Sequence, residues 1–236
     1  MFETTRRDGV ARVRREGARW LSTAWDGGYQ GADAAYAVTV PTGFARTDLD
    51  AYREARLADA GFPVGPTLLT GVEMRHARVA TSGSVTVLAT AGLSNPAALP
   101  MGGDGVASEG ATERDADDTR PWRPGTVNLV VGVERALSDG ALATLLATAV
   151  EAKAATLCSV ADVPGTTSDA ALVGSVPDAE RAEFAGSATE VGAAARACVR
   201  DAVLASLDAR YDEGPPAIGD AEYGVVTDRH TDVRSP

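Results

Sequence analysis

The sequence predicts an α/β or α+β fold, with a mixed sheet that packs against about three main helices in a single domain. Short runs rich in valine and leucine, of the length of buried strands, alternate with longer stretches whose apolar residues recur at helical spacing. A Ser82-Gly83 turn between two of the strand-like runs predicts a hairpin. Because a hairpin pairs its strands antiparallel, we expect the sheet to be mixed.

Each expected element has a local signal in the sequence. Runs of strand-forming residues predict strands at 19–24, 35–40, 76–81, 84–90, 125–134 and 171–176. Helical spacing of apolar residues predicts helices at 47–60, 141–158 and, after Ser187, up to about Leu207. Thr47 and Ser138 are suited to cap the first two helices, and Ser187 with Glu190 matches a capping box for the third.

We divide the chain into three parts by composition. Residues 1–18 form a charged N-terminal segment, expected to be loosely ordered or a strand edge, and residues 19–210 form a single catalytic domain. Residues 101–124 are rich in Asp and Glu with few apolar side chains, which predicts an acidic insertion loop. Residues 211–236 contain prolines and scattered charges and are expected to form a flexible C-terminal tail.

The chain is acidic, with a formal net charge of -11. A negative field of this size disfavours nucleic acid and anionic membrane surfaces as partners. Abundant carboxylates with almost no lysine are typical of proteins from salt-loving organisms, where carboxylates keep a protein in solution. A GC-rich genome, which favours Ala, Arg and Gly codons, predicts a similar bias.

The two cysteines, Cys158 and Cys198, fall inside predicted helices, and we expect both to be small core residues. No Cys or His spacing matches a metal site, so the protein is expected to need no metal or cofactor of its own. We find no apolar run long enough to span a bilayer and no signal peptide, which predicts a cytoplasmic protein. Nothing in the sequence defines an oligomeric state.

Lys153 is the only lysine in the chain, and it lies on the apolar stripe of the central predicted helix. An ammonium in that position loses hydration unless it finds a partner. One interpretation is that Lys153 faces a site, where it binds an anionic or carbonyl oxygen or transfers a proton. The other is that it lies at the edge of the stripe and extends to water.

Polar and aromatic residues gather next to several predicted strands. Trp25 and Tyr29 flank Gly27 and Gly28, whose flexible backbone allows a tight turn; the two rings either form the wall of a pocket or cap the core. Glu73 and Arg75 form either a positioning pair in a site or an ordinary surface ion pair. Other polar groups follow strands or a Pro-Gly turn, where they could hold an oxyanion or bond the local backbone: Asn95, Thr166, Thr167, Ser168 and Asp169.

Six of these motifs, in this order, resemble the adenosylcobinamide amidohydrolases of archaea over roughly residues 19–207. The motifs are 22–25 with 27–29, 69–75, 91–96, 125–128, 151–153 and 165–170. The resemblance implies hydrolysis of the amide between the aminopropanol arm and the corrin ring, which yields adenosylcobyric acid for coenzyme B12 synthesis. Cobalt would then belong to the corrinoid substrate. The acidic stretch 101–123 and a serine at position 168, where threonine is more usual, depart from the pattern.

The resemblance does not assign a mechanism, and the roles that follow are inferred from chemistry. With no Ser-His-Asp set available, we expect Thr167 or a water molecule to attack the amide while Lys153 and Asp169 handle protons. Glu73 completes the candidate catalytic group. Candidate substrate-binding residues are Trp25, Gly27, Gly28, Tyr29, Arg75, Asn95, Asn128 and Thr166, with the two asparagines as donors to the oxyanion or the corrin amides.

Alternatives from other classes stay open at this point. One is an N-terminal-nucleophile amidohydrolase that is cut before Thr126 or Thr166. Another is a corrinoid carrier or sensor without catalysis. His76 could ligate cobalt, but a histidine whose ring bonds its neighbours is the more ordinary interpretation.

Overall fold

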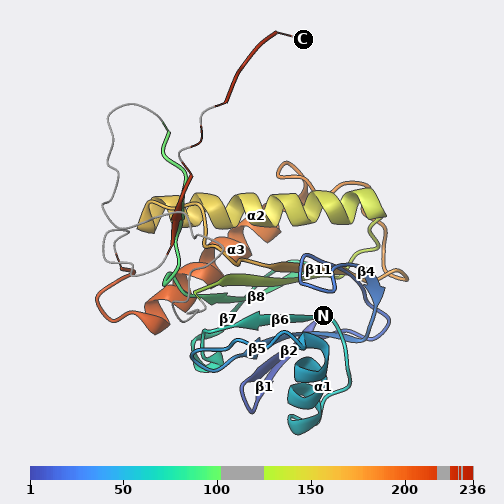
Figure 1. The fold of residues 1–236 in the computed structure, drawn as a ribbon. Coiled ribbons are helices and arrows are strands. Elements are labelled where there is room, and N and C mark those ends of the chain that lie inside the picture. The colour runs from blue at the N-terminus through green and yellow to red at the C-terminus, as the bar shows by residue number, and fades with distance from the viewer. Residues whose placement is uncertain (102–124, 217–223, 228, 230, 236) are drawn as a thin grey trace.

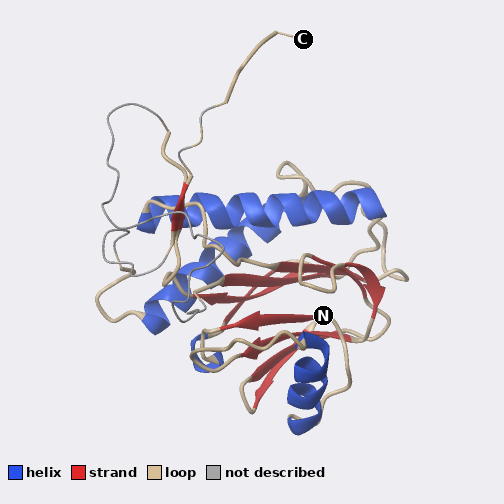
Figure 2. Ribbon diagram, in the orientation of Figure 1, coloured by secondary structure: helices blue, strands red, loops and turns tan. Residues whose placement is uncertain are grey.

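The computed structural model describes residues 1–101, 125–216, 224–227, 229 and 231–235, and its helices and strands form four layers (Figure 1). Helices α2 and α3 cover one face of a six-stranded sheet, and a four-stranded sheet packs on its other face. Helix α1 covers the far face of the four-stranded sheet (Figure 2). This arrangement confirms the predicted α/β class, the three helices and the mixed strand directions. It differs in having two main sheets, and all but one residue of the predicted insertion 101–124 lies outside the described residues.

The six-stranded sheet has the order β4-β3-β11-β10-β8-β7. Strands β10 and β11 are parallel and the other neighbours are antiparallel, because helix α2 carries the chain from the end of β10 back to the start of β11. The hairpin predicted at Ser82-Gly83 is confirmed. The bounds are β3 Arg19–Ser22, β4 Gly28–Gly31, β7 Arg78–Ser82, β8 Val85–Ala91, β10 Val127–Val133, α2 Asp139–Ala161 and β11 Ala171–Ser175.

The four-stranded sheet has the order β1-β2-β5-β6, with one parallel pair, β5 and β6, joined through α1. Its first hairpin is built from the residues expected as a charged N-terminal segment, and Phe2, Val10 and Val13 are buried. The sequence gives neither strand an apolar run, because Arg12 and Arg14 alternate with buried residues in β2 and every residue of β1 is exposed. The bounds are β1 Glu3–Arg7, β2 Val10–Arg14, β5 Ala34–Thr39, α1 Leu49–Asp59 and β6 Thr67–Thr70.

Two aromatic rings fill the space between the sheets. Phe2 and Trp20 meet edge to face, with ring centroids 5.6 Å apart. Glycines on the neighbouring strands make room for them: a Cβ at Gly132 would lie 2.6 Å from Phe2, and one at Gly174 would lie 2.5 Å from Trp20. The N-terminal segment is therefore part of the core.

The helix ends show which capping predictions hold. Ser138 caps α2 as predicted, its side chain accepting a hydrogen bond from the Ala141 N–H. Helix α1 is capped by Asp48 instead of Thr47, and α3, Glu190–Arg210, by Thr189 instead of Ser187. Several candidate caps lie within two residues in both places, and only the backbone path decides which one reaches a free N–H.

Two residues near the C-terminus form a strand against the rest of the fold. Strand β12, Val225–Val226, pairs in parallel with β9, Ala97–Ala98, and Val225 N–H donates to the Pro96 carbonyl at 2.9 Å. Residues 225 and 226 of the expected tail therefore form a strand, and the flexibility of the tail stays a prediction.

The remaining short element is the 3-10 turn η1, Met74–His76, where a strand was expected to begin.

Helix α2 is, among the described residues, the one helix long and apolar enough to cross a membrane. Half of its most apolar window is buried inside the fold, where it packs on the sheet and on α3. The same feature is found in core helices of soluble proteins.

The cysteines provide a direct check on which helix faces are buried. Cys198 is buried in α3 and Cys158 is exposed on α2, so the prediction of two core cysteines is wrong for Cys158. Burial raises the pKa of the Cys198 thiol, which lowers its reactivity further. We expect Ellman's reagent to titrate one thiol quickly in the folded protein and the second only after unfolding. Two fast thiols would contradict the packing of α3.

Candidate active site

The centre of the candidate site is an ion pair between Lys153 on α2 and Asp169, two residues before β11. The side chains are 9% and 14% exposed, respectively. The Lys153 side chain therefore points into the protein and does not extend to water. A buried ammonium needs such a partner because it has left its hydration shell.

The Asp169 carboxylate accepts four hydrogen bonds. Oδ1 accepts from the Val127 N–H at 2.7 Å and from the Thr166 hydroxyl. Oδ2 accepts from the Thr166 N–H at 3.0 Å and from Lys153 Nζ. Since two carboxylate oxygens offer about four acceptor positions, Asp169 has little capacity left to take a proton from a substrate. It fixes the position of the ammonium and joins the start of β10 to the 165–169 turn.

The 165–169 turn is held against the segment that follows β8. Thr167 N–H donates to the Asn95 carbonyl at 3.0 Å, and Ala97 N–H donates to the Gly165 carbonyl at 2.9 Å. Gly165 is required for the close contact: a Cβ there would lie 2.5 Å from Asp169 Oδ2 and 2.8 Å from Lys153 Nζ. The predicted residues Lys153, Asp169, Thr166, Thr167 and Asn95 therefore come together in one place.

Hydroxyl groups at this turn differ in how they are engaged. Thr166 is buried and its hydroxyl is bound to Asp169, whereas Thr167 is exposed and its hydroxyl has no hydrogen bond to another described residue. Ser168 Oγ is buried and, within the described part of the chain, has no partner. Thr167 is thus the hydroxyl most open to a substrate.

Asn128 lies beside the cluster but its amide is engaged in the fold. Its Nδ2 donates to the Leu69 carbonyl at 2.8 Å and its Oδ1 accepts from the Ala170 N–H at 3.0 Å. The residue is 1% exposed. This geometry supports a structural link between the two sheets and the turn, and not the predicted contact with the substrate.

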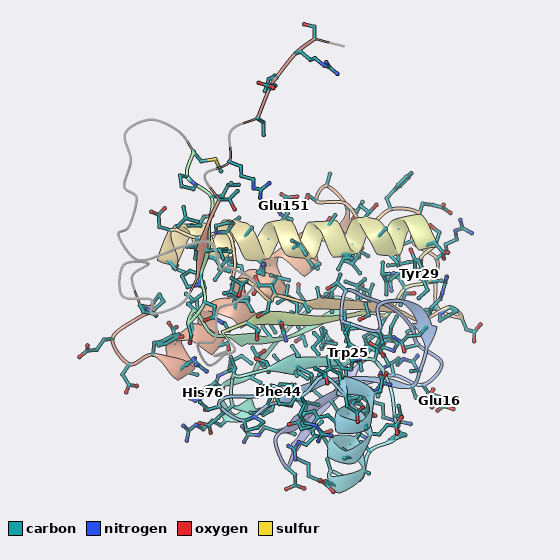
Figure 3. All side chains as sticks on the ribbon, in the orientation of Figure 1. Glu16, Trp25, Tyr29, Phe44, His76 and Glu151 are labelled. Atoms are coloured by element: carbon teal, nitrogen blue, oxygen red, sulfur yellow. The ribbon has the colours of Figure 1, made fainter. Side chains whose placement is uncertain are left out.

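The aromatic pair lies elsewhere on the surface. Tyr29 donates to the main-chain carbonyl of Asp139, the first residue of α2 (Figure 3). Lys153 is fourteen residues further along this helix, which places it about 20 Å away along the axis. Trp25 bonds Asp50 and lies near Arg53 of α1. Gly27 makes the predicted tight turn, where a Cβ would lie 2.7 Å from the Ser22 carbonyl oxygen.

Glu73 and Arg75 form an ion pair at 3.0 Å, with side chains 60% and 67% exposed. Of their two interpretations, the structure supports the surface ion pair, and no contact with Lys153 or Asp169 is present among the described residues. His76 Nδ1 lies 2.7 Å from the Ala209 carbonyl, and Arg75 Nε donates to its Nε2 at 3.0 Å. Both ring nitrogens are therefore bound within the protein.

Sequence reasoning named Thr126 but missed its contact with a second buried threonine next to this cluster. Thr70 Oγ1 and Thr126 Oγ1 lie 2.6 Å apart, one residue before the Val127 N–H that binds Asp169. Their contact joins the end of β6 to the start of β10. Two threonines 56 residues apart give no local signal, so only the packing of the two sheets reveals them.

The described residues contain no group of three or more His, Cys, Asp or Glu side chains that could hold a metal ion. The need for a metal or cofactor stays a matter of prediction.

The adenosylcobinamide amidohydrolase family matches residues 1–215 of this sequence. The chain belongs to this family. An adenosylcobinamide amidohydrolase of Halobacterium salinarum is 52% identical over 239 residues, and the match covers 100% of both chains. The resemblance inferred from the six motifs is confirmed, and it extends to the N-terminal strands that the motifs left out.

Two solved structures are similar to this chain at a much lower sequence identity. A protein of Pyrococcus horikoshii is 10% identical with a TM-score of 0.42, over 87% of this chain and 78% of that one. The L-aminopeptidase D-Ala-esterase/amidase of Ochrobactrum anthropi is 12% identical with a TM-score of 0.40, over 89% and 82%. Similarity at this level defines no residue of the site.

In this amidohydrolase-family chain, strand β12 lies beside the segment that holds the 165–169 turn. Strand β12 pairs with Ala97–Ala98, directly after the segment that binds Thr167. We expect removal of residues 217–236 to leave the four-layer core folded but to lower turnover about ten-fold or more, because small shifts of positioning groups are costly in catalysis. Removal of residues 231–236 alone, which spares β12, is the matched control. Equal turnover in both truncated forms and the full chain would contradict a role for β12.

Proposed function

We propose that this protein hydrolyses the aminopropanol amide of adenosylcobinamide to adenosylcobyric acid, in salvage of corrinoids for coenzyme B12. The observation that carries the proposal is the 52% identity, over the whole chain, to a protein named for this activity. The Lys153–Asp169 cluster offers a site that can serve amide hydrolysis. The protein supplies no cobalt in this scheme, since the metal is part of the substrate.

Amide hydrolysis needs three contributions: an attacking oxygen, stabilisation of the oxyanion and a proton for the leaving amine. Lys153 carries the chain's one lysine ammonium, fixed by a carboxylate in a place largely shielded from water. A positive charge held there can stabilise the developing oxyanion or donate a proton to the amine of aminopropanol. Asp169 then acts as a positioning residue, because its acceptor capacity is used by four donors.

Thr167 provides the attacking oxygen in this proposal. Its hydroxyl is exposed and without a bond to other described residues, while its N–H is fixed on the Asn95 carbonyl. Attack on the amide carbon would form an ester with Thr167 and release aminopropanol, and water would then release adenosylcobyric acid. Direct attack by water is the alternative, and a substitution at Thr167 distinguishes the two routes.

We expect Thr167→Ala to lower turnover about 10²-fold or more without a change in the free energy of unfolding, since the hydroxyl makes no hydrogen bond to the described part of the chain. Thr167→Ser keeps a hydroxyl and should retain most of the activity. Thr166→Ala is the matched control. It removes a hydrogen bond to a buried carboxylate, so it should reduce stability by about 1–3 kcal/mol. Full turnover in folded Thr167→Ala would leave water as the attacking group.

The overall reaction is tested by incubating the purified protein with adenosylcobinamide in high salt, with mass spectrometry of the products. Adenosylcobyric acid and free aminopropanol are the expected products. Binding without products would favour the carrier or sensor. Two fragment masses in place of the intact mass, from cleavage between Gly125 and Thr126 or between Gly165 and Thr166, would favour the N-terminal-nucleophile alternative.

High salt is chosen because the relative named above comes from Halobacterium salinarum and the chain has a net charge of -11. We propose a cytoplasmic enzyme of a salt-loving archaeon that acts on a small-molecule corrinoid. The same charge disfavours nucleic acid and anionic membranes as partners.

A further inference from the structure

A concave site lies in the four-stranded half of the molecule. Its volume is about 670 Å³, and it is lined by the β1–β2 turn, the end of β5, helix α1 and the 73–75 segment. None of Lys153, Thr166, Thr167 or Asp169 lines it. The site is therefore distinct from the cluster to which we assign amide hydrolysis.

Four arginines line this site, in a chain whose net charge is -11. They are Arg6, Arg7, Arg56 and Arg75. The acidic residues in the lining are Asp8 and Glu73, and Glu73 is already paired with Arg75. The lining thus carries a formal charge of +2, from four arginines and two carboxylates, opposite in sign to the protein as a whole.

Three of the arginines have no carboxylate partner in the described part of the chain. Each instead donates to a main-chain carbonyl: Arg6 to Met74 at 3.0 Å, Arg7 to Ala60 at 3.2 Å and Arg56 to Asp8 at 2.7 Å. A guanidinium has five N–H donors, so one such bond fixes its position and leaves most donors available. The three charges are held in place but not neutralised.

The backbone beneath two of these arginines is shaped for close approach. Gly9 has φ +75°, and a Cβ there would lie 2.9 Å from Arg56 Nη2. Gly61 has φ +70°, and a Cβ there would lie 3.3 Å from Arg7 Nη1. A larger residue at either glycine would strain the backbone and displace a guanidinium. Each of these two arginines thus packs against a turn of the neighbouring element, where a glycine leaves room for its guanidinium.

We propose that this arginine-lined site binds a phosphate-bearing small molecule of nucleotide size. Planar guanidinium groups bind phosphate oxygens through paired hydrogen bonds, and several fixed together select a multiply charged anion over chloride. A volume of about 670 Å³ lies within the range of small-ligand sites. The proposal does not depend on the amidohydrolase activity, because adenosylcobinamide itself carries no phosphate.

The test measures binding of ADP and of inorganic pyrophosphate to the full chain by isothermal titration calorimetry, at the lowest KCl concentration that keeps it folded. We expect both probes to bind the wild-type protein. Tighter binding of ADP would show that the nucleoside part also fills the site, and equal affinity would assign the site to the phosphates alone. Failure of both probes to bind would overturn the proposal.

The variant is Arg7→Gln with Arg56→Gln, and we expect it to weaken binding of both probes at least about ten-fold. The matched control is Arg135→Gln with Arg181→Gln, which removes the same charge from another part of the surface and should leave the affinity unchanged. Circular dichroism verifies the fold of each protein. If the first double variant does not fold, Arg6→Gln alone should still weaken binding. Equal affinity in the folded arginine variants and the wild type would overturn the proposal.

Discussion

Lys153→Met is expected to lower turnover of adenosylcobinamide by about 10²–10⁴-fold, the range typical of a lost acid, base or oxyanion-stabilising group. Methionine keeps the length of the side chain and suits the apolar face of α2, but it removes the ammonium. It also leaves the Asp169 carboxylate without its ionic partner, and breaking a buried pair in this way costs about 3–5 kcal/mol of stability. The measurement is turnover by mass spectrometry, with the free energy of unfolding from urea titration.

The loss of activity has to be separated from the loss of stability. The double variant Lys153→Met with Asp169→Asn removes both charges, so it should recover part of the stability lost in the single variant. It should recover no activity, because the ammonium is still absent. Restored turnover in the double variant, or unchanged turnover in folded Lys153→Met, would show that Lys153 has only a structural role.

Asp169→Asn is expected to destabilise the protein by about 3–5 kcal/mol, as much as Lys153→Met. The amide keeps the shape of the carboxylate but loses its charge, and its NH₂ group would face donors where Asp169 now accepts from Val127, Thr166 and Lys153. Turnover should fall together with the stability, because the Lys153 ammonium loses its fixed position.

A nearby aspartate provides the matched control for this substitution. Asp162, the exposed C-cap of α2, has φ +56° and binds none of the site residues. Asparagine tolerates this left-handed backbone, so Asp162→Asn should leave both stability and turnover close to wild type. If Asp169→Asn behaved as Asp162→Asn does, the four hydrogen bonds to Asp169 would not be what stabilises the site.

The central elements of the fold were predictable because each has a strong local signal. Strand β10 is a buried valine-rich run, Ser138 caps the helix that follows, and Ser82-Gly83 closes the hairpin. Lys153 could be singled out because a lone ammonium on an apolar stripe contradicts the pattern around it. The 165–169 turn could be singled out because hydroxyls and a carboxylate follow a Pro-Gly pair.

The remaining features depend on contacts distant in the sequence. The N-terminal strands looked charged because Arg12 and Arg14 alternate with buried side chains in β2 and all of β1 is exposed. Only pairing with β5 gives β2 its place in the core. Asn128 looked like a ligand to the substrate, yet its amide joins Leu69 and Ala170 across three segments. The distance between Tyr29 and Lys153 follows from the length of α2, which no motif shows.

The most direct test of amide hydrolysis at this site is a reaction with adenosylcobinamide in water enriched in oxygen-18, followed by mass spectrometry of both products. Hydrolysis of the amide predicts adenosylcobyric acid with one oxygen-18 atom in the new carboxyl group and an equimolar amount of unlabelled aminopropanol. It also predicts that Lys153→Met forms neither product at a comparable rate. Unlabelled acid, label in the aminopropanol, or no product from a folded wild-type protein would contradict the account.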